Sequence, residues 1–191
     1  IVDNNFRLPR QWRSSLSYEY KLKDGWVLGA SGLYSKSLRE IQIKSINLKD
    51  ETARFNGADD REYYVNSGNA KKINPNFTNV FLLTNTSLGY AYNFTVSLSK
   101  KFDFGLNANV AYNYGESKDV SNGVRNSLAA NFNRNQSINS NDPGLAHSNF
   151  DVRHRIISNT DYSVQLGRGK LTAGALFTLA SGTPFSFIYL G

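Results

Sequence analysis

The sequence predicts an all-β protein, and more specifically a segment of an antiparallel transmembrane β-barrel. Three observations lead to this prediction. Apolar and polar residues alternate over long segments, short turns alternate with long polar loops, and no apolar run approaches the ~20 residues of a transmembrane helix. A soluble β domain is the alternative, but it gives no reason for short and long connections to alternate so regularly.

The clearest alternating segment covers residues 102–115. Every second residue from Phe102 onward is apolar, and the residues between them are polar or small almost throughout. Alternation with a period of two places the two sets of side chains on opposite faces of a strand. If its first two residues belong to a turn, about eleven remain in the strand, and they extend roughly 36 Å at ~3.3 Å per residue. A tilted strand of that length crosses a bilayer.

Five further segments are strand-like, which gives six strands in total. The alternation is clean in the first three of them and less regular in the last two: 11–22, 88–99, 150–166, 26–48 and 171–190. In the last two the apolar parity changes, near Lys36 and near 182–184. One extra residue moves all following side chains to the other face, so each change of parity predicts a bulge or a bend.

The connections between these segments form two classes. Three are short, at 23–25, at about 100–103 and at 167–169, and two are long and polar, at 49–79 and 118–147. The first and third short connections carry a glycine, which can adopt the positive φ of a tight hairpin, whereas the second has none. In an up-and-down barrel this order places all short turns at one rim and all long loops at the other, as in outer-membrane barrels.

Composition agrees with a barrel that has one apolar and one polar face. The mean hydropathy is −0.45 although aromatic residues make up 13% of the chain. Tyrosine and tryptophan concentrate at membrane interfaces, and four such residues are candidates for aromatic girdles: Trp12, Tyr112, Tyr114 and Tyr189. The net charge of +7 is spread over strands, turns and loops, so nucleic-acid binding is not expected.

No arrangement of residues indicates catalysis or a cofactor. The chain has no cysteine, no serine in a Gly-x-Ser-x-Gly elbow and no His–Glu pair with metalloprotease spacing. His147 and His154 are seven residues apart, which would place them on opposite faces of one strand, so a metal pair is not expected. His154 shares the parity of Ile156 and is expected at an interface or a strand end.

Six strands are too few to close a membrane barrel, because the smallest such barrels have eight. Unpaired backbone amides that face hydrocarbon cost several kcal/mol each. We therefore expect residues 1–191 to be part of a single barrel domain within a longer polypeptide, with closure by oligomerisation as the alternative.

Several short motifs occur along the chain in a definite order. They are Phe6-Arg7-Leu8-Pro9 with Trp12, Tyr20-Lys21-Leu22 with Gly25, Leu33–Lys36, Leu83–Tyr90, Tyr112–Gly115 with Ser117–Asp119, Ser148–Ile156, and Ser181–Ser186. In this order and spacing the chain resembles the later barrel strands of TonB-dependent outer-membrane receptors. It is most similar to the Oar-like group, which carries a carboxypeptidase-regulatory-like domain. The most specific pieces are the Asn-Phe-Asp-x-Arg-His-Arg and Asn-Thr-Ser-x-Gly-Tyr runs.

The resemblance implies a 22-stranded barrel that is filled by a plug, lies in the outer membrane of a Gram-negative bacterium and contacts its lipid. It also implies active uptake of a scarce solute, driven by a TonB complex that acts through an N-terminal part. The plug, the N-terminal domain and the final strands match nothing in this chain. The alternative is a structural, assembly or export role in which long loops dock a surface lipoprotein or another outer-membrane partner. An enzyme barrel is a distant third reading.

Candidate contact residues lie in the loops and on the polar parity of one strand. The loop at 49–79 offers charged and aromatic side chains: Arg54, Asp59, Asp60, Arg61, Tyr63 and Tyr64. The loop at 118–147 adds Asn131 and Asn133, whose irregular spacing favours turn chemistry over calcium binding. Asp151, Arg153 and Arg155 share one parity and are expected to form a ladder of lumenal charges. The alternative for the loop at 49–79 is that it only covers the end of the barrel and is solvated. The alternative for the three charged residues is that they are solvated and pair only with one another.

Overall fold

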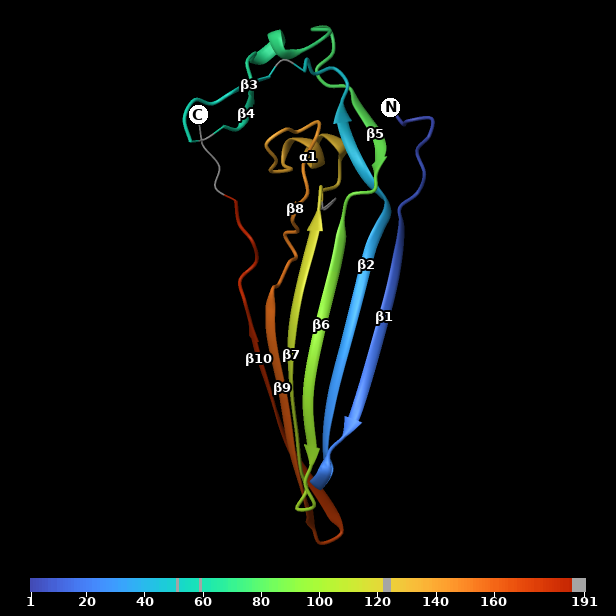
Figure 1. Ribbon diagram of the computed structural model, residues 1–191, viewed down its shortest axis with the longest axis vertical. Coiled ribbons are helices and arrows are strands. Elements are labelled where there is room, and N and C mark those ends of the chain that lie inside the picture. The colour runs from blue at the N-terminus through green and yellow to red at the C-terminus, as the bar shows by residue number, and fades with distance from the viewer. Residues whose placement is uncertain (51, 59, 122–124, 187–191) are drawn as a thin grey trace.

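Six long antiparallel strands form one open sheet along the long axis of the molecule (Figure 1). The computed structural model describes residues 1–50, 52–58, 60–121 and 125–186. The long strands, in sheet order, are β1 (Arg10–Lys21), β2 (Trp26–Ser45), β6 (Tyr90–Lys101), β7 (Leu106–Asp119), β9 (His154–Leu166) and β10 (Gly169–Ala180). Each long strand lies beside the next one along the chain, so the prediction of an antiparallel sheet of six long strands is confirmed.

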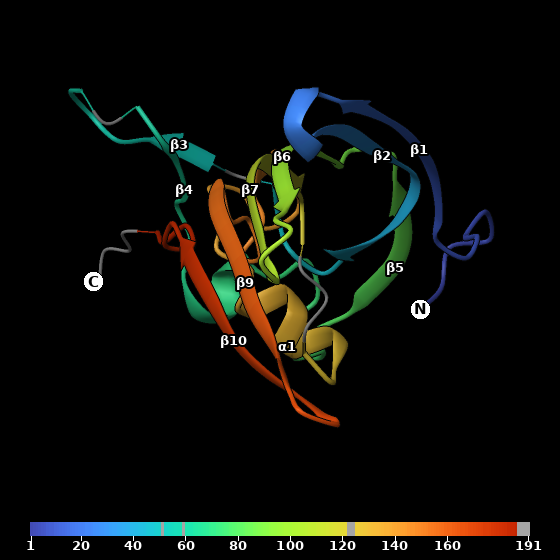
Figure 2. The same ribbon diagram turned by 90° about the horizontal axis from the view of Figure 1, so that it is seen from below.

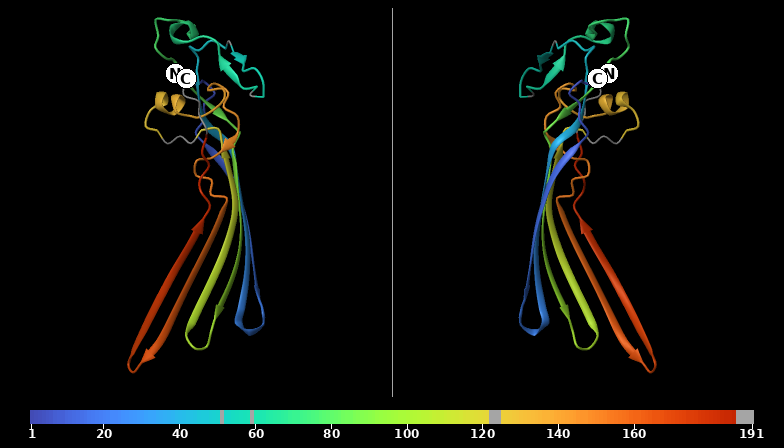
Figure 3. Two further views of the ribbon diagram at one scale, coloured as in Figure 1. Left: turned by 90° about the vertical axis from the view of Figure 1, so that its left-hand side faces the viewer. Right: turned by 90° about the vertical axis from the view of Figure 1, so that its right-hand side faces the viewer.

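The short turns lie together at one end of the sheet and the long loops at the other, as predicted (Figures 1 and 3). Shorter elements occur in the loop half and at the first turn: η1 (Lys23–Gly25), β3 (Thr52–Arg54), β4 (Glu62–Tyr64), η2 (Gly68–Lys71), β5 (Phe81–Thr86), α1 (Leu128–Asn133) and β8 (Ala146–His147). No helix in the described ranges is long and apolar enough to cross a membrane.

Two expected boundaries and one expected turn are wrong. The strand expected at 150–166 begins only at His154, and the strand expected at 171–190 ends at Ala180. The last four residues of that expectation, 187–190, lie outside the described residues. The turn expected at about 100–103, without glycine, lies at 102–105 because β6 continues to Lys101. Gly105 belongs to this turn and has a φ of 96°.

The predicted change of parity near Lys36 is a β-bulge. On one side of β2, Gln11 pairs with Ser37 but Arg10 pairs with Arg39, so Leu38 is left over. On the other side, β2 pairs with β6 up to Lys36 and then with β5. The sequence of β5 lacks alternation and did not predict a strand. It forms a strand because the upper half of β2 offers backbone partners.

The register places apolar and polar residues on opposite faces of the whole sheet. One cross-strand row is apolar on all six strands: Tyr18, Ala30, Val96, Tyr112, Ile156 and Leu179. The neighbouring row, one residue away on each strand, points to the other face and is polar on five strands: Ser17, Ser31, Thr95, Asn113, Arg155 and Ala180. Because successive side chains of a strand alternate between faces, the sheet has an apolar face and a polar face.

The apolar face is not covered by any other part of the described chain. Leu16 is 79% exposed and Phe177 is 59% exposed, and among the described hydrophobic residues Val120 alone is buried. An apolar surface of this extent requires lipid or another protein to cover it. The two edge strands, β1 and β10, lie apart from each other, so the sheet is open (Figure 2). The expected further strands that would close the barrel stay a prediction.

Replacing a residue of the apolar face by arginine tests which face meets lipid. Leu16→Arg should destabilise the complete barrel in lipid vesicles by about 2–4 kcal/mol, the cost of arginine near the bilayer midplane. Ser17→Arg, one residue away on the polar face, should change the free energy of unfolding by much less. Equal effects of the two substitutions in urea unfolding experiments would contradict the assignment of the faces.

Gly105→Ala tests the turn between β6 and β7. A Cβ at this position would overlap the backbone carbonyl of Ser163, and the positive φ is strained for alanine. We expect a loss of roughly 1–3 kcal/mol in the free energy of unfolding. Gly57→Ala is the matched control, because Gly57 has a φ of 95° but open space around it. A loss no larger than that of the control would show that the close contact with β9 is unimportant.

Candidate functional site

A belt of aromatic side chains crosses the apolar face near the loop end. Trp12 and Tyr34 are 6.0 Å apart between ring centroids, Tyr92 and Tyr114 are 6.3 Å apart, and Tyr114 and His154 are 5.3 Å apart. The belt covers β1, β2, β6, β7 and β9. His154 is the first residue of β9, which confirms its expected position at a strand end.

A second aromatic group lies near the turns. The ring centroids of Trp26 and Phe102 are 6.3 Å apart, and those of Phe102 and Phe104 are 5.2 Å apart. The Lys100 ammonium lies 5.1 Å from the Trp26 ring centroid, which suits a cation at a membrane interface.

The two aromatic groups are separated by about the thickness of a membrane. On three strands, aromatic residues toward the two ends are eight positions apart: Trp12 and Tyr20, Trp26 and Tyr34, and His154 and Tyr162. Eight residues of a strand cover about 26 Å. This distance is close to the ~25 Å apolar band of outer-membrane barrels, which is flanked by aromatic girdles. Of the predicted girdle residues, Trp12 and Tyr114 belong to the belt, the Tyr112 ring lies 6.2 Å from that of His154, and Tyr189 lies outside the described residues.

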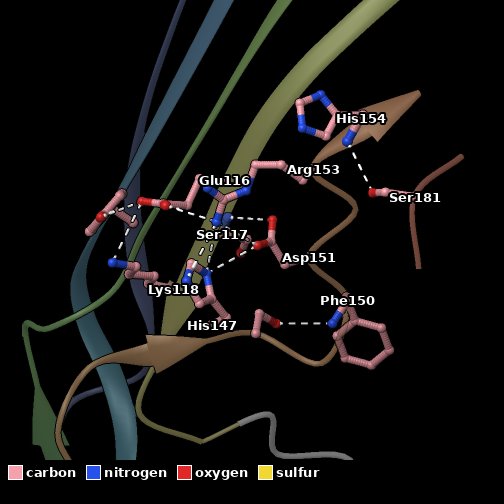
Figure 4. A network of polar contacts seen from close by, with 11 residues as sticks. Glu116, Ser117, Lys118, His147, Phe150, Asp151, Arg153, His154 and Ser181 are labelled. Atoms are coloured by element: carbon pink, nitrogen blue, oxygen red, sulfur yellow. Dashed lines mark hydrogen bonds and ion pairs between the residues drawn. The ribbon is translucent and has the colours of Figure 1, made fainter. Parts of the chain in front are cut away.

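A network of charged side chains, here called the rim network, joins the end of β7 to the segment before β9 (Figure 4). Arg153 lies 3.0 Å from Glu116 and 3.3 Å from Asp151, measured from its Nη2 atom to one carboxylate oxygen of each. Asp151 is only 4% exposed, and its Oδ1 accepts a hydrogen bond of 3.0 Å from the Ser117 amide. His147 Nδ1 lies 3.1 Å from both Asp151 Oδ2 and Arg153 Nη2, so it either donates to the former or accepts from the latter.

Further contacts complete the rim network. Tyr90 donates a 2.7 Å hydrogen bond to Glu116, and the Lys118 ammonium lies 3.8 Å from the same carboxylate. The backbone of β8 pairs with the end of β7, and the Ser148 amide donates to the Ser117 carbonyl at 2.9 Å. These contacts hold the chain that returns from the long loop against the rim of the sheet.

A cavity of about 210 Å³, here called the rim cavity, lies beside this network. Its walls include Asn93 and Asn113 from the strands, Phe150 and Asp151 from the returning segment, and Arg155 from β9. The strand residues belong to the polar face. Gly115 also lines the cavity, and a Cβ there would overlap the Asn93 side chain, so this glycine leaves room for the Asn93 amide.

The predicted ladder of Asp151, Arg153 and Arg155 is wrong as a continuous ladder. Arg155 lies on the polar face, opposite Asn113. Arg153 instead reaches Glu116, which shares the parity of Tyr112 and Tyr114. The reason is that β9 begins at His154, and the preceding residues turn, with a 2.9 Å hydrogen bond from the Asp151 amide to the Ser148 carbonyl.

The candidates from the loop at 49–79 lie on or beside the β3–β4 hairpin. Arg54 lies 2.9 Å from the Asp60 carboxylate and 3.2 Å from that of Glu62. The backbone carbonyl of Arg61 accepts a hydrogen bond from the Phe55 amide, and Asp59 lies outside the described residues. The Arg54 and Asp60 side chains are well exposed, so these ion pairs add little to stability.

The two tyrosines of this hairpin have different surroundings. The ring of Tyr63 packs on Phe55 with the centroids 4.6 Å apart. Tyr64 donates a 3.0 Å hydrogen bond to Asn139 of the other long loop. Burial, with the carboxylates of Asp50 and Glu62, raises the pKa of Tyr64, so its hydroxyl remains a donor above the usual range of tyrosine.

One of the two asparagine candidates makes local hydrogen bonds. Asn131 lies in α1, accepts a hydrogen bond from the Arg125 amide and donates to the carbonyls of Arg125 and Ser127. Asn133 is the last residue of α1. None of the loop candidates is among the described residues that line the rim cavity. In the same ranges no group of three His, Asp or Glu side chains is arranged to hold a metal ion.

Sequence reasoning selected Asp151, Arg153 and Arg155 but missed the other residues that build the rim cavity and the rim network. Asn93 and Asn113 stand on the polar parity of two clean strands, and that position was the available signal for a lumenal role. Glu116 and His147 gave no signal, because their contacts depend on where the loop returns to the sheet.

The long strands, the single apolar face, the two aromatic groups and the sorted turns together define a segment of an outer-membrane β-barrel. The family model of an outer membrane beta barrel domain matches residues 1–190, so the chain belongs to this family. No curated protein and no solved structure matches the chain. Membership in this family places the protein in the outer membrane of a Gram-negative bacterium.

Asp151→Asn tests whether the rim network holds the returning segment. The substitution removes the charge that Arg153 and His147 contact, and we expect faster hydrogen exchange at the Ser117 amide and faster proteolysis at residues 144–152. The expected cost is about 1–3 kcal/mol for local opening, typical of a buried hydrogen bond to a charged group. Asp103→Asn, in an exposed turn at the opposite end, is the control. Unchanged exchange in Asp151→Asn would contradict the proposed role.

Proposed function

We propose that this chain is part of a TonB-dependent receptor that actively imports a scarce solute across the outer membrane. The observation that carries the proposal is that three motifs of the family resemblance meet at one place. The Gly115 amide donates to the Arg153 carbonyl at 3.0 Å, and the His154 amide donates to the Ser181 hydroxyl at 3.1 Å. Three motifs that are far apart in the sequence thus form one structure at the loop end of the sheet.

The polar face supports the same proposal. A transporter barrel needs a lumenal wall of hydrogen-bonding side chains, and the row through Thr95 and Asn113 provides one. Outer-membrane lipid would cover the apolar face, and a TonB complex would supply energy through an N-terminal part of the protein. We further propose that the chain acts by binding and transport and not by catalysis, and that it uses no cofactor.

Comparative uptake by whole cells tests the transport proposal. Cells with the intact gene, cells without it and cells without TonB would be supplied with a mixture of solutes at limiting concentrations. We expect one solute class to remain in the medium of both mutants and to disappear from that of the intact cells. If loss of the gene blocks uptake but loss of TonB does not, the barrel is a passive pore. If neither mutation changes the depletion of any solute, the import proposal is wrong.

A structural or assembly role is the second candidate, and one observation favours it. The loop at 49–79 exposes apolar side chains at its surface, among them Phe55 at 49%, Val65 at 58% and Phe77 at 55%. Exposed apolar residues on a loop suit a protein partner such as a surface lipoprotein. A photo-crosslinking residue at Phe55 of the complete protein should then capture one specific lipoprotein in cells, whereas a crosslinker at Phe104, near the turns, should not.

A further inference from the structure

The rim cavity combines a location and a chemistry that point to a ligand. It lies on the polar face, close to the end of the sheet where the long loops gather. In outer-membrane barrels the long loops are extracellular, so a solute from outside would meet this cavity before the deeper lumen.

Among the described residues that line the rim cavity, one cationic side chain has no partner. Both carboxylates at the cavity, Glu116 and Asp151, are paired with Arg153 at 3.0 and 3.3 Å. Arg155 also lines the cavity and is exposed, and its guanidinium makes no hydrogen bond or ion pair with another described residue. Because Arg153 already balances the carboxylates, the Arg155 guanidinium is available for an anionic group, which it can bind through two parallel hydrogen bonds.

Neutral polar groups surround this cation. Asn113 pairs directly across the sheet with Arg155 and lines the cavity, and its amide nitrogen donates to the Thr95 hydroxyl at 2.9 Å, which leaves its side-chain oxygen free to accept. Asn93 contributes a second amide from the neighbouring strand. Side-chain amides of this kind recognise hydroxyl groups, because each offers both donors and an acceptor.

An aromatic ring completes the cavity. Phe150 lines the cavity and is 68% exposed, although Ser148 and Asp151 in the same segment are buried. An exposed ring next to amides and a guanidinium suits a ligand that has one apolar face and a polar periphery, as a sugar ring has. The volume of about 210 Å³ is below the range of ~300–1,000 Å³ for drug-sized ligands, so the cavity fits a single small unit.

We propose that the rim cavity binds a solute of monosaccharide size that carries one carboxylate or phosphate group. Arg155 binds the anionic group, Asn93 and Asn113 bind hydroxyl groups, and Phe150 packs on the ring. The inference rests on the proposed function in so far as the solute is the one imported, but binding itself needs no TonB.

Calorimetric titration of the complete, purified barrel protein tests this proposal. The probes are glucuronate for a carboxylate, glucose 1-phosphate for a phosphate, and glucose as the neutral comparison. We expect at least one anionic probe to bind at least about tenfold more tightly than glucose, the size of a charge-assisted hydrogen bond. The comparison between glucuronate and glucose 1-phosphate identifies which anionic group the site prefers.

Variants of this protein separate the site from general electrostatics. Arg155→Gln should weaken binding of the anionic probe at least about tenfold. Arg155→Lys should weaken binding less because the charge remains. Arg13→Gln is the control, since Arg13 lies on the polar face of β1 outside the cavity. The dissociation constant of the anionic probe for this variant should stay within about twofold of that for the unchanged protein. Asn113→Asp keeps the side-chain size, places a carboxylate opposite Arg155 and should also weaken binding at least about tenfold.

The outcomes distinguish this proposal from the transport proposal. Equal binding of glucose and the anionic probes, no effect of Arg155→Gln and Asn113→Asp in correctly folded protein, or no binding of either anionic probe up to about 10 mM would each overturn the inference. Folding of each variant is verified by its heat-dependent mobility in gel electrophoresis. If binding is retained while uptake does not depend on TonB, the site stands and the proposed transport mechanism falls.

Discussion

The cross-strand backbone hydrogen bond is the interaction on which the rest of this structure depends. In hydrocarbon no water can satisfy an amide or a carbonyl, and each unpaired group costs several kcal/mol. The long strands, of 12 to 20 residues, are accordingly paired without a register shift across most of their length. A continuous register carries an apolar row from Tyr18 on β1 to Leu179 on β10. The separation of the two faces is therefore a consequence of backbone pairing, and the side chains then adapt to each face.

Regular pairing ends at the loop end, and the candidate site begins there. The bulge at Leu38 shifts the register of β1 against β2, and β9 ends its pairing with β7 at His154. Beyond these points some backbone groups are satisfied by side chains, as when Asp151 accepts from the Ser117 amide. Polar side chains are needed in this zone for the backbone itself, and the same side chains create a cavity that a regular ladder could not form.

The sequence was sufficient to predict the six strands, the faces and the sorting of the connections, because each depends on a period of two and on turn residues. It also located the bulge near Lys36 through the change of parity. It could not predict β5, because Phe81–Thr86 becomes a strand only through the backbone partners that β2 offers. It misplaced Asp151 and Arg153, since a parity argument holds only inside a strand and β9 begins after them. The contacts of Glu116 and His147 depend on the path of a long loop, which local patterns do not specify.

Two arginines that are two residues apart illustrate how the boundary of a strand decides the role of a side chain. Within a strand Arg153 and Arg155 would face the same side, and both would be lumenal cations. Because β9 begins between them, Arg153 turns toward Glu116 and Asp151 and balances two carboxylates at the rim. Arg155 remains on the polar face opposite Asn113, beside the rim cavity. Lys118 lies near Glu116 and His147 lies near Asp151, so these carboxylates do not need Arg155 as a partner. The position of the first residue of β9 thus links the rim network to the chemistry of the cavity.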